Sequence, residues 1–161
     1  MKVDLLEDGD RRHGPKEMIV NTEWGAFGNQ GELDFILTKW DRRVDASSVN
    51  PGKQIFEKMI SGMYMGEVTR QVLVDLVKEN LIFVGKDTSN LMKHGRFYTK
   101  YVSEIESDPV GAFVRCREAL SDLGIGYVSD EGIVLQILFI RENIKVIFLF
   151  KYGVLDVKAI L

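Results

Sequence analysis

The feature that most constrains the fold of this chain is a long amphipathic pattern between residues 54 and 80. Apolar side chains recur there at steps of three and four residues: Ile55, Phe56, Met59, Ile60, Met63, Tyr64, Val68, Val72, Leu73, Leu76 and Val77. This spacing predicts one long helix with an apolar face. Met59 and Met63 fall on that face, which favours core packing over a cofactor-binding role for both.

Two glycines, Gly62 and Gly66, lie one turn apart inside the predicted helix. A glycine in a helix interior costs about 1 kcal/mol relative to alanine. We therefore expect another part of the molecule to approach the helix backbone closely on the face that carries these two glycines.

The segments before the long helix predict a strand and a second helix. The run MIVNTEW at 18–24 is short, apolar and followed by glycines, which is typical of a strand. Residues 32–48 show apolar side chains at helical spacing and end in a Ser-Ser-Val-Asn-Pro-Gly stretch that stops a helix.

The segments after the long helix predict further helical structure. Residues 88–108 favour a short helix, a stop at Gly95 and a partly extended segment. Residues 109–124 predict a helix with Pro109 in its first turn and Gly124 at its C-terminal cap.

The size and charge of the chain bound its class. Its 161 residues suffice for one ordinary domain, and 45% hydrophobic with 28% charged residues is the composition of a folded soluble protein. A net charge of −3 gives no electrostatic reason to expect nucleic acid or an anionic membrane as a partner. The longest apolar run, between Lys145 and Lys151, is far shorter than a membrane span.

Cysteine and histidine usage suggests a cytoplasmic protein without a metal site. A single cysteine, Cys116, cannot form an internal disulfide, and its helical context favours a small buried side chain over a nucleophile. His13 and His94 lack ligand neighbours at metal-site spacing, so we expect no zinc site. The N-terminal residues have neither a secretory nor a transit composition, which favours the cytoplasm.

The stretch NTEWGAFG at 21–28 raises three possible roles. Its glycines and Gly31 are spaced G-x-x-G-x-x-G, which differs from both common phosphate-binding loops, so a glycine-rich turn is favoured over a phosphate site. The carboxylate of Glu23, beside glycines that permit close approach, is a candidate acceptor for sugar hydroxyls. The competing interpretation is a solvated acidic residue at a turn.

Glu57 is a second candidate acceptor. It falls in the early turns of the long predicted helix, where an acidic side chain is also favoured simply because it complements the helix dipole. From the residues alone, both interpretations of Glu57 stay open.

Three stretches together resemble consecutive segments of the hexokinase family: MIVNTEWGAFGNQGELD, SSVNPGKQIFEKMISGMYMGEVTRQVL and GRFYTKYVSEIESD. Their order and spacing agree with the family from about Val3 to about Val134. The resemblance implies an α/β fold of the actin-like, ribonuclease-H-like type, of which this chain would be a mostly helical part of the large domain with few strands. It divides the chain into residues 1–135, which match that domain, and a divergent tail at 136–161.

The resemblance also implies a reaction and its residues. The family transfers a phosphoryl group from MgATP to the 6-hydroxyl of glucose or another hexose, the first step of glycolysis. The family's two glucose-binding carboxylates fall on Glu23 and Glu57, with Gln54 in the same sugar-contacting region. Gly62 and Met63 match a position close to bound ATP.

The departures from the family pattern imply limits on this chain. The family's catalytic aspartate is expected upstream of Met1, and most ATP-binding segments have no match, so no catalytic residue is assigned and the chain alone is expected to be inactive. An alternative is a non-catalytic hexose-binding or regulatory module derived from a hexokinase.

Overall fold

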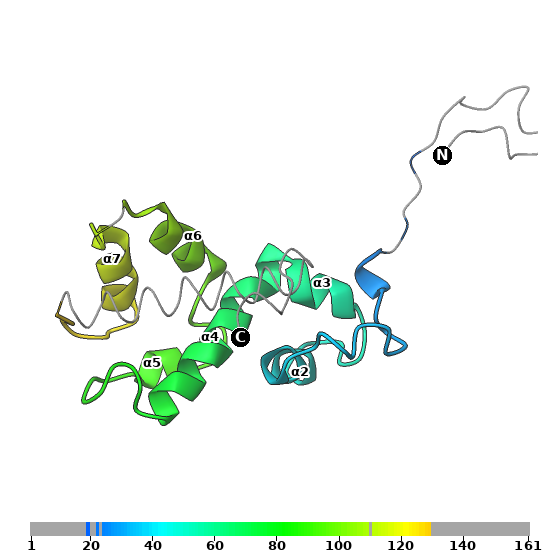
Figure 1. Ribbon diagram of the computed structural model, residues 1–161, viewed down its shortest axis with the longest axis horizontal. Helices are drawn as coiled ribbons and strands as arrows, with labels where there is room; N and C mark the ends of the chain where they lie inside the picture. The colour runs from blue at the N-terminus through cyan, green and yellow to red at the C-terminus, as the bar shows by residue number, and fades with distance from the viewer. Residues whose placement is uncertain (1–18, 20–21, 23, 110, 130–161) are drawn as a thin grey trace, which may run out of the picture.

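Figure 1 shows the computed structural model, which describes residues 19, 22, 24–109 and 111–129. The elements in chain order are the 3-10 helix η2 (Trp24–Ala26) and six α-helices: α2 (Lys39–Ala46), α3 (Ile55–Ile60), α4 (Gly62–Lys78), α5 (Ser89–Met92), α6 (Thr99–Ser107) and α7 (Val114–Asp122). The described part contains no strand. Most of the strand predicted at 18–24, and the whole tail at 136–161, lie outside the described residues.

Helix α4 is the central element of the described structure. It contacts α2 and α3 on one side and α5 and α6 on the other, while α6 packs on α7 (Figure 1). The predicted long helix is therefore only partly correct, because two helices replace it. Ser61 interrupts it with extended backbone (ψ 137°), and its side chain accepts a hydrogen bond from the Met63 N–H as the N-cap of α4.

The break at Ser61 explains why one of the two methionines is buried and the other is exposed. Met59 on α3 is 5% exposed, as the core prediction requires. Met63 is 79% exposed, so its assignment to the core is wrong. The apolar periodicity continued across Ser61 in the sequence, but the change of backbone direction turns the start of α4 away from the core.

Close approach to the glycine face occurs at Gly66. A Cβ built on Gly66 would lie 2.5 Å from the Thr99 backbone nitrogen and 2.7 Å from the Phe97 carbonyl oxygen. A Cβ on Gly62 would meet nothing within 4 Å. The expectation of backbone contact is confirmed for Gly66 and is wrong for Gly62.

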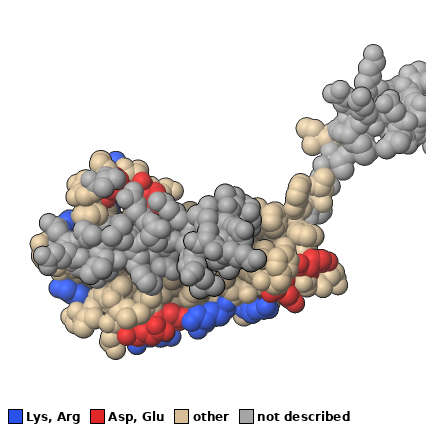
Figure 2. Space-filling model, viewed as in Figure 1, with Lys and Arg blue, Asp and Glu red and all other residues tan. Residues whose placement is uncertain are grey.

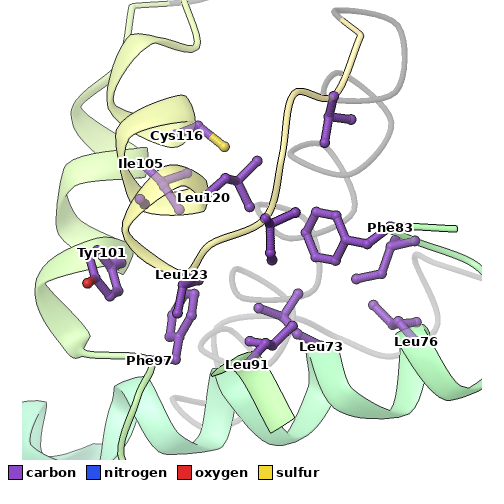
Figure 3. Packing of buried hydrophobic residues seen from close by; sticks show 14 of the residues in the cluster. Leu73, Leu76, Phe83, Leu91, Phe97, Tyr101, Ile105, Cys116, Leu120 and Leu123 are labelled. Carbon is purple, nitrogen blue, oxygen red and sulfur yellow. The ribbon is translucent and has the colours of Figure 1, made fainter. Parts of the chain in front are cut away.

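One large hydrophobic core joins α4 to the helices that follow it (Figure 3). Its buried members are Val72, Leu73, Leu76, Ile82, Phe83, Leu91, Phe97, Tyr101, Val102, Ile105, Cys116, Ala119, Leu120, Leu123, Ile125 and Val128. Leu91, one of its members, has no exposed surface. Burial, with the nearby Asp108, raises the pKa of the Cys116 thiol to about 11, and the predicted burial of this cysteine is confirmed.

The partly extended segment predicted before residue 108 is wrong, because residues 99–107 form α6. Tyr101, Val102 and Ile105 place one face of α6 in the large core. Aromatic and β-branched residues favour strands by propensity, and here the tertiary contacts override that preference.

Helix α7 begins later than predicted. Pro109 lies outside it, and Val114 is its first residue. The Asp108 carboxylate accepts hydrogen bonds from the Arg115 and Cys116 N–H groups, both at 3.1 Å, and so caps the first turn from a distance along the chain. Gly124 follows the helix with φ 73°, and its N–H donates to the Ser121 carbonyl, which confirms its predicted capping role.

Helix α2 also begins later than the predicted 32–48, since residues 32–36 form turns and Leu37 has no regular structure. Thr38 caps α2 in a capping box with Asp41. Asp75 of α4 then fixes α2 in place: it accepts from Trp40 Nε1 at 3.0 Å, and its carboxylate lies 2.6 Å from Arg43 Nη1 and 2.9 Å from Lys39 Nζ.

Candidate functional site

The glycine-rich stretch after Trp24 is a series of turns. Gly28 and Gly31 have φ of 88° and 95°, values that favour glycine over any other residue. This confirms the turn interpretation of the stretch. Gly25 lies in η2, where Gln54 and Glu57 pack close to its Cα.

The turns cap the first turn of α3. The Phe27 carbonyl accepts a hydrogen bond from the Phe56 N–H at 3.1 Å, and Asn29 Oδ1 accepts from the Ile55 N–H at 3.2 Å. These N–H groups have no partner within their own helix. The glycine-rich stretch is therefore fixed to the start of the helix that carries Glu57.

Gly25 lies against two of the predicted sugar-binding residues. A Cβ built on it would be 2.5 Å from Gln54 Oε1 and 3.3 Å from Glu57 Oε2. A larger residue at this point would displace the Gln54 side chain from its observed position. Glu23, two positions earlier, lies outside the described residues, so its own place in the site stays a prediction.

Aromatic rings add to the contact between η2 and α3. Trp24 stacks on Phe56 with ring centroids 6.3 Å apart, and Phe27 meets the same ring edge-on at 6.1 Å. The η2 turn and α3 therefore form one packed unit.

Gln54 and Glu57 occupy the N-terminal end of α3. Gln54 precedes the helix with φ 53° and ψ 44°, a left-handed backbone conformation that is uncommon for residues other than glycine. Glu57 lies in the first turn, as predicted, and its side chain is exposed. An exposed carboxylate and an adjacent amide can accept hydrogen bonds from sugar hydroxyls.

The two residues predicted near ATP lie at the other end of α3, where α4 begins. Met63 is exposed and the Cα of Gly62 faces open space, so a ligand can approach the backbone there. The Thr99 hydroxyl donates to the Gly62 carbonyl and accepts from the Gly66 N–H at 2.8 Å. Sequence reasoning missed Thr99, although the glycines on α4 indicated that some segment approached this face.

A buried ion pair holds the segment that leads to Thr99. Arg70 binds both carboxylate oxygens of Glu67 at 2.6 and 2.8 Å, and it also donates to the Leu91 and Met92 carbonyls. Burial acts to raise the pKa of Glu67, but the hydrogen bonds from Arg70 and the Gly95 N–H outweigh it and lower the pKa. The sequence analysis did not identify this pair.

Two cavities flank the site. One of about 490 Å³ lies between the glycine-rich turns, α2 and α3, and its lining includes Asn29, Arg42, Asp45 and Lys58. The other, of about 380 Å³, lies between α2, the start of α4 and residues 94–99, and Met63 and Thr99 line it. Gln54 and Glu57 line neither cavity.

Charges of both signs are interspersed on the face of the molecule shown in Figure 2. Within the described residues, no group of three or more His, Cys, Asp or Glu side chains is arranged to hold a metal ion. A search of the same residues for a helix with the length and apolar character of a bilayer span found none.

Comparison with known proteins identifies the family. A family model described as hexokinase matches residues 1–147. The chain belongs to the hexokinase family. It is 43% identical over 134 residues to human hexokinase HKDC1, and 50% identical over 129 residues to hexokinase-2 of Equus caballus.

The match to these hexokinases covers most of this chain but only a small part of theirs. It covers 83% of this chain and 14% of the human protein, and 80% of this chain and 13% of the equine one. The chain thus spans about a seventh of the length of the curated relatives that it matches.

A solved structure supports the fold. The hexokinase from Schistosoma mansoni complexed with glucose superposes with a TM-score of 0.71 at 35% identity, over 81% of this chain and 29% of that one. The predicted fold class, a mostly helical part of the actin-like hexokinase fold, is confirmed. The division at residue 135 falls outside the described residues and stays a prediction.

Proposed function

We propose that this chain carries hexose-binding residues of a hexokinase, an enzyme that transfers the γ-phosphoryl group of MgATP to the 6-hydroxyl of glucose or a related hexose. The observation that carries the proposal is the contact of Gly25 with Gln54 and Glu57, which joins the NTEWG stretch to the start of α3. The solved hexokinase with which the chain superposes is described as a complex with glucose.

In this proposal Glu57 and Glu23 accept hydrogen bonds from hexose hydroxyls, and Gln54 orients the sugar beside them. Carboxylate acceptors suit this task because charge-assisted hydrogen bonds are about twice as strong as neutral ones. The exposure of Glu57 supports its availability to a ligand. The position of Gly25, two residues after Glu23, supports the convergence of the two carboxylates.

ATP is proposed to bind as a co-substrate near Gly62 and Met63. The open space at Gly62 and the exposed Met63 support access to the backbone at the start of α4. In phosphoryl transfer most of the catalysis comes from positioning and from stabilisation of charge, so this segment would contribute by holding the nucleotide relative to the sugar.

We also propose that the isolated chain of 161 residues does not turn over glucose, because the family's catalytic aspartate has no counterpart among the residues that match. A coupled assay for ADP measures this directly. We expect no glucose-dependent ADP formation above that of a Glu57→Gln variant. Clear turnover by the wild-type chain alone would refute this part of the proposal.

Glucose binding tests the site itself. We expect calorimetry to detect glucose binding at millimolar affinity or tighter, and Glu57→Gln to weaken it about ten- to a hundredfold, the worth of one hydrogen bond to a charged group. Glu79→Gln, an exposed carboxylate at the far end of α4, is the matched control and should leave the affinity unchanged. Equal binding by the wild type and Glu57→Gln would contradict the site.

The same measurements separate the alternative function. A non-catalytic hexose-binding module derived from a hexokinase would bind glucose through Glu57 and would show no turnover when combined with the rest of a hexokinase. Recovery of turnover on such recombination would favour the enzymatic role.

A further inference from the structure

We propose that the Asp45–Lys58 ion pair positions Gln54 and Glu57 for the hexose. The inference rests on the proposed function, because it assigns two positioning residues to that same site. Neither residue lies at the exposed surface where the sugar would bind; both act through the turn and the helix that carry the binding side chains.

The two side chains of the pair are close together, and Lys58 is buried. The Lys58 side chain is 4% exposed and that of Asp45 is 24% exposed, and Lys58 Nζ lies 2.7 Å from Asp45 Oδ1. Lys58 is the immediate neighbour of Glu57 on α3, and successive helix positions point about 100° apart. The carboxylate of Glu57 is therefore exposed while the ammonium of Lys58 is directed inward, toward α2.

The pair binds both ends of the turn at residues 50–53. Lys58 Nζ donates to the Asn50 carbonyl at 2.8 Å. Both carboxylate oxygens of Asp45 accept from the Gly52 N–H at 3.0 Å. The turn is closed by the Lys53 N–H, which donates to the Asn50 carbonyl at 3.1 Å. One ion pair thus fixes the segment that immediately precedes Gln54.

Gln54 needs such support. Its φ of 53° is unfavourable for a residue with a side chain, and a conformation of this kind persists only where the surroundings fix it. The turn at 50–53 constrains the backbone before Gln54. The hydrogen bonds that the Phe56 and Ile55 N–H groups donate to the Phe27 carbonyl and Asn29 Oδ1 constrain the backbone after it. Removal of the ion pair therefore releases the backbone on the N-terminal side of Gln54.

A purely structural ion pair would affect the molecule differently from a positioning one. Asp75 with Arg43 provides the comparison, because that pair joins α2 to α4 at 2.6 Å and makes no hydrogen bond to the 50–53 turn. A structural role predicts that breaking either pair loosens the whole molecule. A positioning role predicts that only the loss of Asp45–Lys58 loosens the backbone around Gln54.

Residue-resolved amide hydrogen exchange on the full chain makes this distinction without any ligand. Lys58→Met, which removes the charge and keeps the length of the side chain, should speed exchange at the Gly52, Ile55 and Phe56 amides at least about tenfold more than at the amides of α4. Arg43→Met should not produce this local difference. Equal acceleration at all amides, or no change at residues 52–56, would overturn the inference.

Calorimetry with glucose gives the functional readout. We expect Lys58→Met to weaken glucose binding at least about tenfold, Arg43→Met to change it less than about twofold, and Lys58→Arg to recover part of the loss. Unchanged glucose affinity in Lys58→Met would overturn the inference. If the wild-type chain binds no glucose, the proposed function fails, and the hydrogen-exchange comparison alone then decides whether the pair positions residues 52–57.

A second variant covers the case in which Lys58→Met does not fold. Asp45→Asn keeps the volume and one acceptor oxygen for the Gly52 N–H but removes the negative charge that Lys58 requires. It should show the same local acceleration and the same loss of glucose affinity, to a smaller degree. A folded Asp45→Asn variant with wild-type exchange at residues 52–56 would contradict the positioning role.

Discussion

The elements on the two sides of α4 are stabilised by different kinds of interaction. On one side, α4 to α7 share a core of sixteen buried residues, mostly aliphatic and aromatic. On the other side, the buried apolar cluster that the described residues form between the glycine-rich turns and α3 consists of Leu33, Ile55 and Met59. The Phe27 carbonyl and the Asn29 side chain, which cap α3, and the ion pair of Asp45 with the buried Lys58 supply much of the remaining contact.

This difference is consistent with the proposed hexose site at the start of α3. Apolar burial stabilises a structure without fixing its orientation closely, whereas hydrogen bonds and ion pairs specify direction. The side that carries Gln54 and Glu57 is the one in which polar contacts set the geometry. We therefore expect substitutions in the large core to change stability most, and substitutions around α3 to change ligand binding most.

Truncation of one side chain in each cluster tests the difference most strongly. Leu91→Ala truncates a fully buried side chain of the large core and should cost about 3–5 kcal/mol in the free energy of unfolding. Met59→Ala in the small cluster should cost about 2 kcal/mol, at the low end of such substitutions, because few apolar neighbours surround it. Urea denaturation measures both values.

Leu81→Ala is the matched control for these truncations, since Leu81 is 61% exposed and should tolerate the change within about 0.5 kcal/mol. A larger loss for Met59→Ala than for Leu91→Ala would reverse the assigned order of the two clusters.

The glycine pair on α4 gives the next largest effect. Gly66→Ala places a Cβ within 2.7 Å of backbone atoms of residues 97–99 and should cost about 1–3 kcal/mol or more, because backbone cannot move aside cheaply. Gly62→Ala meets open space at a helix start and should be neutral or stabilising by up to about 1 kcal/mol. The melting temperature should therefore fall for Gly66→Ala and stay the same or rise for Gly62→Ala. Equal losses in the two variants would contradict the contact at Gly66.

Acid should weaken the contact between α2 and α4 that Asp75 makes. Burial acts to raise the pKa of Asp75, but hydrogen bonds from Lys39, Arg43 and Trp40 outweigh it and lower the pKa from 3.8 to about 2. Because the folded-state pKa is depressed, this contribution to stability is fully present above about pH 4 and is lost as the pH falls toward 2. Its size is about 1–2 kcal/mol, since Lys39 and Arg43 are half exposed.

Asp75→Asn should remove this part of the pH dependence while lowering stability at pH 7, as denaturant titrations at pH 7 and pH 3 would measure. Glu79→Gln is the exposed control. An Asp75→Asn variant that loses as much stability between pH 7 and pH 3 as the wild type would show that other carboxylates carry the effect.

The sequence predicted the large core better than the region around α3. Regular apolar spacing at 68–77 marked the buried face of α4, and a glycine at 124 marked the end of α7. Periodicity missed the break at Ser61, because a Ser-Gly pair that starts a new helix leaves the apolar pattern almost in register. The same continuity made Met63 resemble a core residue.

The site was predicted through resemblance and not through its physical supports. Glu57 and Gln54 were assigned by matching motifs, and the structure places both against Gly25. Asp45 and Lys58 gave no signal, since a lone Asp and a lone Lys thirteen positions apart are common on any surface. Only the fold brings them together and buries the lysine.

A nuclear magnetic resonance titration with glucose tests the central claim most directly, because it maps binding onto both sides of α4 at once. The account predicts that the backbone amides of Gly25, Gln54 and Glu57 shift on addition of glucose, and that those of the large core around Leu91 and Leu120 do not. Shifts confined to the large core, or the same shifts in a Glu57→Gln variant, would contradict the assignment of the hexose site to the start of α3.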